Sequence, residues 1–166
     1  MGKRFSSSFD SPVPVEQLYG VLTAPGWAAT KSARLGDDSS VVRRDVGEGA
    51  AVTMVVSRRL PGGVPGFLQR FLPSDQRVTT SDVWGPLVEG VRRGTWSADI
   101  AGAPATLGGA MRIEPVEGGS RYTIEGEVKV SVPLIGGKAE SFIAEQVGKL
   151  AEAEAEVVRQ VLASPA

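Results

Sequence analysis

The sequence contains no histidine and no cysteine. The chain therefore has no imidazole or thiolate to bind a metal ion, no thiol nucleophile, and no imidazole to act as a general acid or base. A serine, histidine and aspartate triad is excluded for the same reason. Disulfides are excluded as well, so cysteine usage says nothing about the redox compartment. Glutamate, aspartate, arginine and tyrosine remain as the plausible polar groups for a site.

The sequence also lacks an excess of charge of either sign and a long apolar run. Its 18 basic and 19 acidic residues give a formal net charge of −1, whereas a nucleic-acid-binding protein would show a basic domain or stripe. No stretch approaches the roughly 20 apolar residues that span a bilayer, and the N-terminal residues form no hydrophobic signal core. We therefore expect a soluble cytoplasmic protein, monomeric or homodimeric, that binds no nucleic acid and has no integral membrane association.

What the sequence does contain is enough apolar material for one core. The chain has 166 residues, of which 42% are apolar, and glycine and proline turn signals are spread from end to end. A domain of this length buries roughly 68–70% of the surface that its unfolded chain exposes, so it folds without disulfides or a metal. No repeat and no long linker divides the sequence. We expect a single domain over residues 1–166.

Alternation of apolar and polar residues predicts a strand-rich, antiparallel architecture. The first strand is expected over Lys3 to Phe9, and two prolines then introduce a short helix over Val15 to Leu22. A second short helix around Gly26 to Ala33 follows. Six further strands, separated by hairpin-like turns such as Pro86 to Gly90, are predicted over Ser39 to Val46, Ala50 to Leu60, Gln76 to Trp84, Gly90 to Ile100, Ala105 to Pro115 and Ser120 to Val132.

The last element is predicted to be a long amphipathic helix, because residues 138–163 contain no proline and only one glycine, Gly148. Such a helix is about 39 Å long, and a seven-stranded sheet is about 29 Å wide, so the helix can cross the whole sheet. A helical wheel separates an apolar sector from a polar one. The apolar sector holds Ile143, Val147, Leu150, Val157, Val158 and Val161, and the polar sector holds Ser141, Glu145, Lys149, Glu152, Glu156 and Arg159.

Several segments resemble one known group of sequences. They are Arg58-Arg-Leu-Pro61 with Pro65-Gly-Phe-Leu-Gln-Arg-Phe-Leu72, Asp82-Val-Trp-Gly-Pro86, and Val128-Lys-Val-Ser-Val-Pro-Leu-Ile-Gly-Gly-Lys-Ala-Glu140 continuing to Ile143-Ala-Glu-Gln-Val147. With the order of the expected elements, they make the chain similar to the START-like (SRPBCC, helix-grip) superfamily. Within it, the chain resembles an uncharacterised family of high-GC Gram-positive bacteria. The resemblance covers essentially the whole chain.

The resemblance implies an α+β, helix-grip fold, in which a curved seven-stranded antiparallel sheet wraps around a long C-terminal helix and two short helices follow the first strand. It also implies a cavity that many superfamily members use for lipids, sterols, polyketides or aromatic ligands. It supplies no catalytic residues, and we expect no cofactor and no metal. We therefore expect a binding protein for a small hydrophobic or amphipathic molecule. The alternatives are an enzyme resembling polyketide cyclases or aromatases, and a protein-interaction module without a ligand.

The last predicted strand alternates so that Ile124, Gly126 and Val128 share one dry face. The same parity on neighbouring strands assigns tryptophan, methionine and further glycine residues to this face. The glycines either let the sheet curl and leave room for a ligand, or allow the helix to approach closely. The candidate cavity residues are Met54, Val56, Arg58, Phe67, Phe71, Asp82, Trp84, Trp96, Met111, Tyr122, Phe142, Gln146 and Glu154.

Two of these candidates, Gln146 and Glu154, interrupt the apolar sector of the long helix. A buried carboxylate without a partner costs several kcal/mol or takes up a proton, so Glu154 needs a cation or water. Either Glu154 and an arginine orient a ligand's polar end or act as acid and base, or Glu154 lies near the helix end and pairs structurally or reaches solvent. The other charged residues whose strand parity allows an inward position are Arg44, Arg58, Arg92 and Asp82.

One or two helical turns are expected over Phe67 to Leu72, where four of six residues are apolar. The preceding Gly62, Gly63 and Gly66 permit the backbone changes that a mobile lid needs. This segment is therefore either a lid over the cavity mouth or a static plug that closes one end of the sheet. Contact with a membrane surface is a third option.

Overall fold

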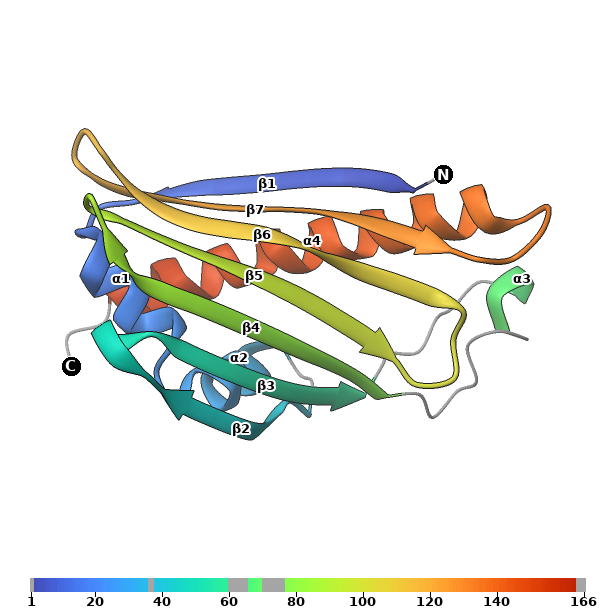
Figure 1. Ribbon diagram of the computed structural model, residues 1–166, viewed down its shortest axis with the longest axis horizontal. Helices are drawn as coiled ribbons and strands as arrows, with labels where there is room; N and C mark the ends of the chain where they lie inside the picture. Colours follow the sequence, from blue (N-terminus) through green and yellow to red (C-terminus); the bar gives the residue numbers. More distant parts are fainter. Residues whose placement is uncertain (1, 36–37, 60–65, 70–76, 164–166) are drawn as a thin grey trace.

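The computed structural model describes residues 2–35, 38–59, 66–69 and 77–163. Seven strands and four α-helices lie in these ranges, together with the short 3-10 helix η1 (Glu48–Ala50) (Figure 1). The strands are β1 (Lys3–Ser11), β2 (Ser40–Val46), β3 (Val52–Arg59), β4 (Arg77–Val88), β5 (Val91–Ile100), β6 (Ala105–Val116) and β7 (Gly119–Val130). The helices are α1 (Val15–Leu22), α2 (Trp27–Leu35), α3 (Gly66–Gln69) and α4 (Gly136–Ala163).

The strands form one antiparallel sheet in the order β1-β7-β6-β5-β4-β3-β2 (Figure 1). Strands β2 to β7 each pair with the next strand in sequence, as the predicted hairpin turns require. β1 instead pairs with β7 at one edge of the sheet, and α1 and α2 carry the chain across to β2 at the other edge. The expected helix-grip fold, with two short helices after the first strand, is therefore confirmed.

β4 is longer than predicted, and the expected turn over Pro86 to Gly90 is wrong. The strand continues through Pro86 to Val88, and the turn consists of Glu89 and Gly90, which have φ angles of 52° and 79°. The pairing of β4 with β5 shifts register between Trp84 and Leu87. A bulge of this kind tolerates proline because the missing N–H is not required by the ladder there.

α4 is an amphipathic helix of 28 residues, which corresponds to about 42 Å. It runs along the length of the sheet (Figure 1). Its buried side includes Val157 and Val158, and the predicted polar sector is exposed. The buried carboxylate of Glu140 accepts a 2.9 Å hydrogen bond from the Val130 N–H, which ties the start of α4 to the end of β7. Neither α4 nor any other helix in the described ranges is long and apolar enough to cross a membrane.

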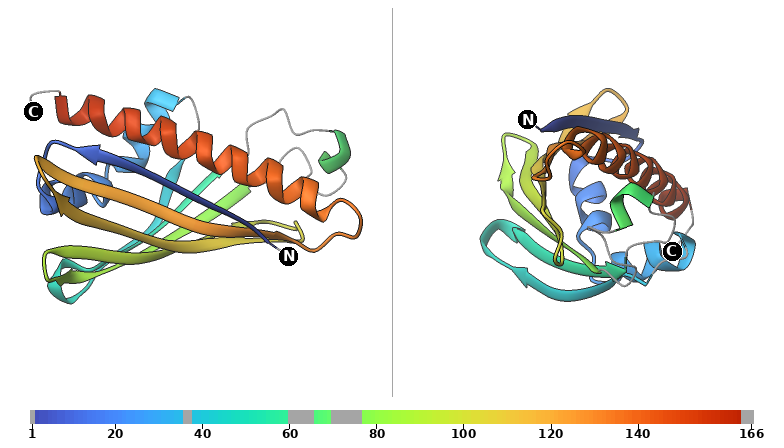
Figure 2. Two further views of the ribbon diagram at one scale, coloured as in Figure 1. Left: turned by 90° about the horizontal axis from the view of Figure 1, so that it is seen from above. Right: turned by 90° about the vertical axis from the view of Figure 1, so that its right-hand side faces the viewer.

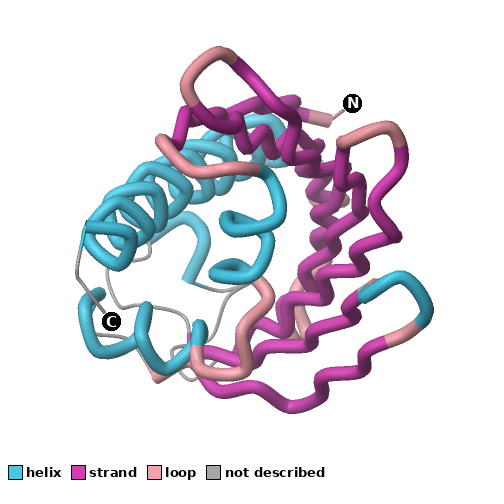
Figure 3. The backbone as a smooth tube through the Cα atoms, turned by 90° about the vertical axis from the view of Figure 1, so that its left-hand side faces the viewer, coloured by secondary structure: helices cyan, strands magenta, loops and turns pink. Residues whose placement is uncertain are grey.

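The sheet curves around the helices instead of lying flat against them (Figures 2 and 3). α4 packs against β1 and β7 and also touches α2. Its backbone does not come comparably close to β3, β4 or β5. The inner faces of these three strands therefore lie farther from the α4 backbone than those of β1 and β7 do.

A row of glycines on the inner face makes room for Trp96. This residue pairs in register with Gly109, which pairs with Gly126 on β7. A Cβ atom at Gly126 would lie 2.6 Å from Cζ2 of Trp96, and the indole N–H donates a 3.1 Å hydrogen bond to the Glu125 carbonyl. The ring of Phe5 lies beside the indole, with a centroid distance of 5.7 Å. Gly126 thus accommodates the side chain of Trp96 from the same sheet.

Candidate functional site

A carboxyl group lies on the inner face of β4, in largely apolar surroundings. Asp82 has the same strand parity as the buried Val78 and Trp84. Its register neighbours are Met54 on β3 and Trp96 on β5, and both are buried. Two apolar side chains therefore flank the Asp82 carboxyl within the sheet, as expected for the lining of a ligand site.

Asp82 has no polar partner in the described part of the chain. It accepts no hydrogen bond and forms no ion pair there, although its side chain is only half-buried. The surrounding protein is dense enough that desolvation raises the pKa of this carboxyl from 3.8 to about 6. The positive charge of Lys31 acts in the opposite direction, and the negative charge of Glu154 adds to the rise. A desolvated carboxyl without a protein partner lowers the free energy of unfolding. Its presence favours a role for Asp82 in ligand binding or catalysis.

Lys31 and Glu154 form an ion pair between α2 and α4. The distance between Lys31 Nζ and Glu154 Oε1 is 2.8 Å, and the two side chains are 18% and 29% exposed. Nζ also lies 5.7 Å from the centroid of the Trp27 ring. Glu154 therefore has the cation that a buried carboxylate needs, but the cation is a lysine and not one of the arginines that we expected.

Tyr122 of β7 is the fourth polar residue of this region. Its hydroxyl contacts Sδ of Met111 at 3.9 Å, and sulfur is only a weak acceptor. Burial holds the pKa of Tyr122 well above its ordinary value, and the carboxylates of Asp82 and Glu154 raise it further. We call Lys31, Asp82, Tyr122 and Glu154 the inner polar cluster.

A small cavity of about 20 Å³ lies at one side of the inner polar cluster. This volume is enough for about one water molecule. Tyr122 and Glu154 both border the cavity, so it meets the cluster directly. The remaining lining residues come from β1, α1, β7 and α4 and are Ser7, Phe9, Leu22, Ile124, Ala151 and Val158.

Arg92 is not a partner of Glu154 but the centre of a separate structural clamp. It is 2% exposed, and its Nε and Nη2 atoms donate hydrogen bonds of 2.8 and 2.9 Å to the carboxylate of Glu16 on α1. Nη1 donates to the carbonyl oxygens of Gly49 at 3.0 Å and Gly85 at 2.9 Å. The guanidinium lies 4.0 Å from the centroid of the Tyr19 ring. Arg92 therefore joins α1, η1 and the bulge of β4.

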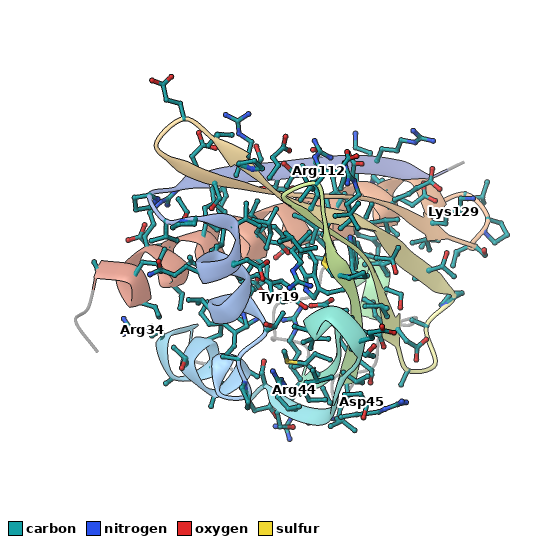
Figure 4. All side chains as sticks on the ribbon, turned by 60° about the vertical axis from the view of Figure 1, so that its left-hand side comes forward. Tyr19, Arg34, Arg44, Asp45, Arg112 and Lys129 are labelled. Carbon is teal, nitrogen blue, oxygen red and sulfur yellow. The ribbon has the colours of Figure 1, made fainter. Side chains whose placement is uncertain are left out.

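The other two arginines considered for an inward position do not pair with Glu154 either. Nε of Arg44 donates a 2.9 Å hydrogen bond to the carbonyl of Thr23, just after α1; Arg44 and Tyr19 are both labelled in Figure 4. Arg58 is half-buried on β3, four residues beyond Met54. In the described ranges, no three acidic side chains gather where they could hold a metal ion.

The remaining sequence-based candidates occupy different environments. Gln146 is exposed, so the inward position expected for it is wrong. Phe67 on α3 is 37% exposed, with Lys138 Nζ 5.6 Å from its ring centroid. Phe71 lies outside the described residues, as do Gly62 and Gly63, so the choice between lid and plug remains a hypothesis. Met54, Trp84, Trp96 and Met111 are buried, and Val56, Arg58, Tyr122 and Phe142 are half-buried.

Lys31 is the member of the cluster that the sequence analysis missed. The polar groups expected for a site do not include lysine, and α2 is expected only as a short helix. A usable signal exists, because Lys31 follows Trp27 by four residues and such residues share one face of a helix. Trp27 is buried, so the same face carries Lys31 toward the interior.

Asp82→Asn is expected to stabilise the ligand-free protein by about 2 kcal/mol at pH 8. The folded-state pKa of about 6 exceeds the ordinary 3.8, so the native state binds this proton more tightly than the unfolded chain does. Stability due to the bound proton is therefore lost as the pH rises between these two values, and asparagine avoids the loss. Urea unfolding at pH 4 and pH 8 tests this, with the exposed Asp99→Asn as the control. A gain for Asp82→Asn that is equal at both pH values contradicts it.

The amino-acid sequence matches a family across almost its whole length. The family model is described as "Protein of unknown function (DUF2505)" and matches residues 6–162. An uncharacterised protein of Mycobacterium tuberculosis and one of Mycobacterium bovis are each 33% identical to this chain over 168 residues. Each match covers 93% of this chain and 93% of the relative. The predicted resemblance to an uncharacterised family of high-GC Gram-positive bacteria is confirmed.

Solved structures share the fold at low sequence identity. A protein of Thermus thermophilus has a TM-score of 0.65 and 14% identity, with coverage of 98% of this chain and 100% of that chain. Norcoclaurine synthase from Thalictrum flavum has a TM-score of 0.58 and 13% identity, with coverage of 99% and 88%. The same enzyme in complex with dopamine and hydroxybenzaldehyde has a TM-score of 0.57 and 14% identity, with coverage of 98% and 87%. These likenesses establish the fold alone.

Proposed function

This chain belongs to the DUF2505 family, and from that premise we propose that it binds a small hydrophobic or amphipathic molecule between the curved sheet and α4. The observation that carries the proposal is the Asp82 carboxyl, which is half-buried on the inner face and has no polar partner in the described residues. No fully buried side-chain oxygen or nitrogen of the described residues lacks a hydrogen-bond partner, so the Asp82 carboxyl reaches solvent, but partial desolvation still disfavours its ionised form. A ligand that donates a hydrogen bond to this carboxyl offsets that cost.

The arrangement of the sheet and α4 supports the same proposal. α4 is close to β1 and β7 and more distant from β3, β4 and β5, so the two layers are joined tightly along one side only. The cavity of about 20 Å³ is far smaller than the roughly 300 Å³ or more of a typical ligand site. We infer that the ligand enters by widening this space, through rearrangement of the half-buried side chains around it.

A further support comes from a protein that shares the fold. Norcoclaurine synthase has been solved with dopamine and hydroxybenzaldehyde bound. Both are small molecules with an aromatic ring. The interior of this chain also offers aromatic surfaces, since Trp84 and Tyr122 lie with ring centroids 6.1 Å apart and Trp96 flanks Asp82. A molecule with a flat apolar body is therefore a suitable ligand.

Titration with the neutral fluorescent dye Nile red tests the proposed function. We expect saturable binding of one dye per chain, with an increase in fluorescence as the dye leaves water. Ala151→Phe should weaken this binding about tenfold or more, because Ala151 borders the cavity and a phenyl ring fills it. Ala110→Phe is the matched control, since Ala110 is exposed on β6.

Thermal unfolding of both variants shows that each is folded before the dye is added. The proposal fails if the dye does not bind saturably to the wild-type protein. It also fails if the two folded variants bind the dye equally well, because the dye then sits on an outer surface.

Catalysis on a bound molecule is the second candidate function. The observation that favours it is again Asp82, because a carboxyl with a pKa of about 6 exchanges a proton near neutral pH. Asp82→Asn separates the two functions when a converted substrate is found. Loss of turnover with retained binding supports catalysis, and retained turnover excludes Asp82 as the acid or base.

A further inference from the structure

The charges around the inner polar cluster do not balance. Lys31 and Glu154 neutralise each other at 2.8 Å, which leaves the Asp82 carboxylate without a cation among the described residues. The nearby arginines are committed elsewhere, because Arg92 pairs with Glu16 and Arg44 donates to a backbone carbonyl. Within the inner polar cluster, the described residues therefore leave one negative charge uncompensated when Asp82 is ionised.

Arg58 does not supply the missing charge. It is half-buried on β3, and its register partner is Val78, while the register partner of Asp82 on the same strand is Met54. Four residues of an extended strand span about 13 Å, which places Arg58 well away from the carboxyl. The charges that act on Asp82 are those of Lys31 and Glu154.

The surfaces beside Asp82 are suited to the apolar part of a cationic molecule. Met54 and Trp96 flank the carboxyl, and a tryptophan face attracts a positive charge as well as an apolar group. Among the described residues, the Tyr122 hydroxyl has a methionine sulfur as its one partner, so it can accept a hydrogen bond from a ligand.

We propose that the ligand carries a basic amine at its polar end, with the ammonium group on Asp82 and an apolar or aromatic body along Met54, Trp96 and Tyr122. This inference rests on the proposed function, because it names the chemical class of the molecule bound at that site. An ammonium group neutralises the Asp82 carboxylate and donates hydrogen bonds that no described residue supplies to it. A carboxylate ligand meets repulsion from Asp82 and finds Lys31 already paired with Glu154.

Three matched compounds test the chemical class. They are 4-phenylbutylamine, 4-phenylbutanol and 4-phenylbutanoate, which share one apolar body and differ in the polar end. Each is titrated at pH 7.5 against the complex of the protein with Nile red, and displacement of the dye gives its affinity. We expect the amine to bind about tenfold more tightly than the alcohol, and the carboxylate to bind most weakly.

Asp82→Asn identifies the group responsible. In this variant the advantage of the amine over the alcohol should fall to about twofold or less, while the affinity of the alcohol stays within about twofold of the wild-type value. Asp99→Asn is the matched control, because it removes the same charge from the exposed side of β5 and should leave all three affinities unchanged.

The pH dependence adds a second readout. The groups that face Asp82 from the packed elements are Lys31 on α2, Glu154 on α4 and Tyr122 on β7, and the flanking Met54 and Trp96 are uncharged. Protonation of Asp82 as the pH falls through about 6 should weaken amine binding and leave alcohol binding unchanged. Asp82→Asn should lose this pH dependence, and a pH dependence of amine binding that survives in the variant contradicts the role of Asp82.

The outcomes separate this inference from the proposed function. Equal affinities for the amine and the alcohol, tightest binding of the carboxylate, or an amine preference that survives in Asp82→Asn each overturn the inference while leaving the binding function in place. Failure of all three compounds to displace the dye also overturns it. Failure of the dye itself to bind the wild-type protein removes the proposed function as well.

Discussion

Replacing Arg92 with methionine should lower the free energy of unfolding by about 3 kcal/mol. The guanidinium is 2% exposed and donates to Glu16 and to the carbonyl oxygens of Gly49 and Gly85. Methionine retains much of the apolar volume but donates nothing, so two backbone carbonyls lose their charged donor. The Glu16 side chain is 51% exposed and can return to water, which keeps the expected loss at the lower end for a broken buried pair.

Urea unfolding of three variants tests this expectation. Arg93→Met is the matched control, because Arg93 is the exposed neighbour on the same strand and should change stability by less than about 0.5 kcal/mol. Arg92→Lys should recover only part of the loss, since an ammonium group cannot make the forked contacts of a guanidinium. Equal stability of Arg92→Met and Arg93→Met would show that the clamp contributes nothing.

The clamp also predicts a pH dependence. Arg92 holds the pKa of Glu16 below its ordinary value, chiefly through their hydrogen bonds. A lowered carboxyl pKa contributes stability that is present above the ordinary glutamate pKa and is lost as the pH falls through the folded-state value. The difference in stability between the wild type and Arg92→Met should therefore shrink in strongly acidic solution.

Gly109→Ala should destabilise the protein by about 3 kcal/mol, and we expect the same change at Gly148 to have the opposite sign. A Cβ atom at Gly109 would lie 2.0 Å from the Glu125 carbonyl oxygen and 2.5 Å from the Gly126 Cα atom. Both obstacles are backbone atoms of the neighbouring strand β7, so no side-chain rotation relieves the clash. β6 and β7 would have to move apart in the interior of the sheet.

Gly148→Ala is the matched control, because the chemical change is identical and the surroundings differ. Gly148 is in the interior of α4, and apart from its chain neighbours and the adjacent backbone of the helix, no atom of the described residues lies within 4 Å of a Cβ built there. Alanine there should stabilise the protein by up to about 1 kcal/mol, because glycine is the poorer helix former. Thermal unfolding of the two variants gives the answer directly, and a shift in the same direction for both contradicts the argument.

Much of the fold could be predicted from local patterns. The helix over Val15 to Leu22 has its predicted bounds, and the long last helix begins two residues earlier than expected, at Gly136. Amphipathic patterns and turn signals each involve residues that are only a few positions apart, so a single sequence is enough to detect them. The end of β4 could not be predicted in this way, because a proline in the sequence is compatible with both a turn and a β-bulge. Only the pairing of β4 with β5 distinguishes the two.

The site was predictable in part. Strand parity assigned Asp82 an inward position, and the helical wheel placed Glu154 beside the apolar sector, because both patterns repeat over short distances. The partner of Glu154 was not predictable, since Lys31 lies 123 residues away in the sequence. Gln146 shows the limit of the wheel, because a helix that covers only part of a curved sheet leaves some of its apparent inner side exposed.

The sequence by itself determined which chemistry is absent, and it indicated many of the residues that face inward. Without histidine and cysteine, any site must use carboxylates, hydroxyls, lysine or arginine, and alternation along the strands directs a few of these to the interior. Only the tertiary structure decided how the charges are paired: Arg92 with Glu16, Lys31 with Glu154, and Asp82 with none of the described residues. The physical reason is that periodicity is local, whereas electrostatic pairing depends on which distant elements are brought within a few ångströms.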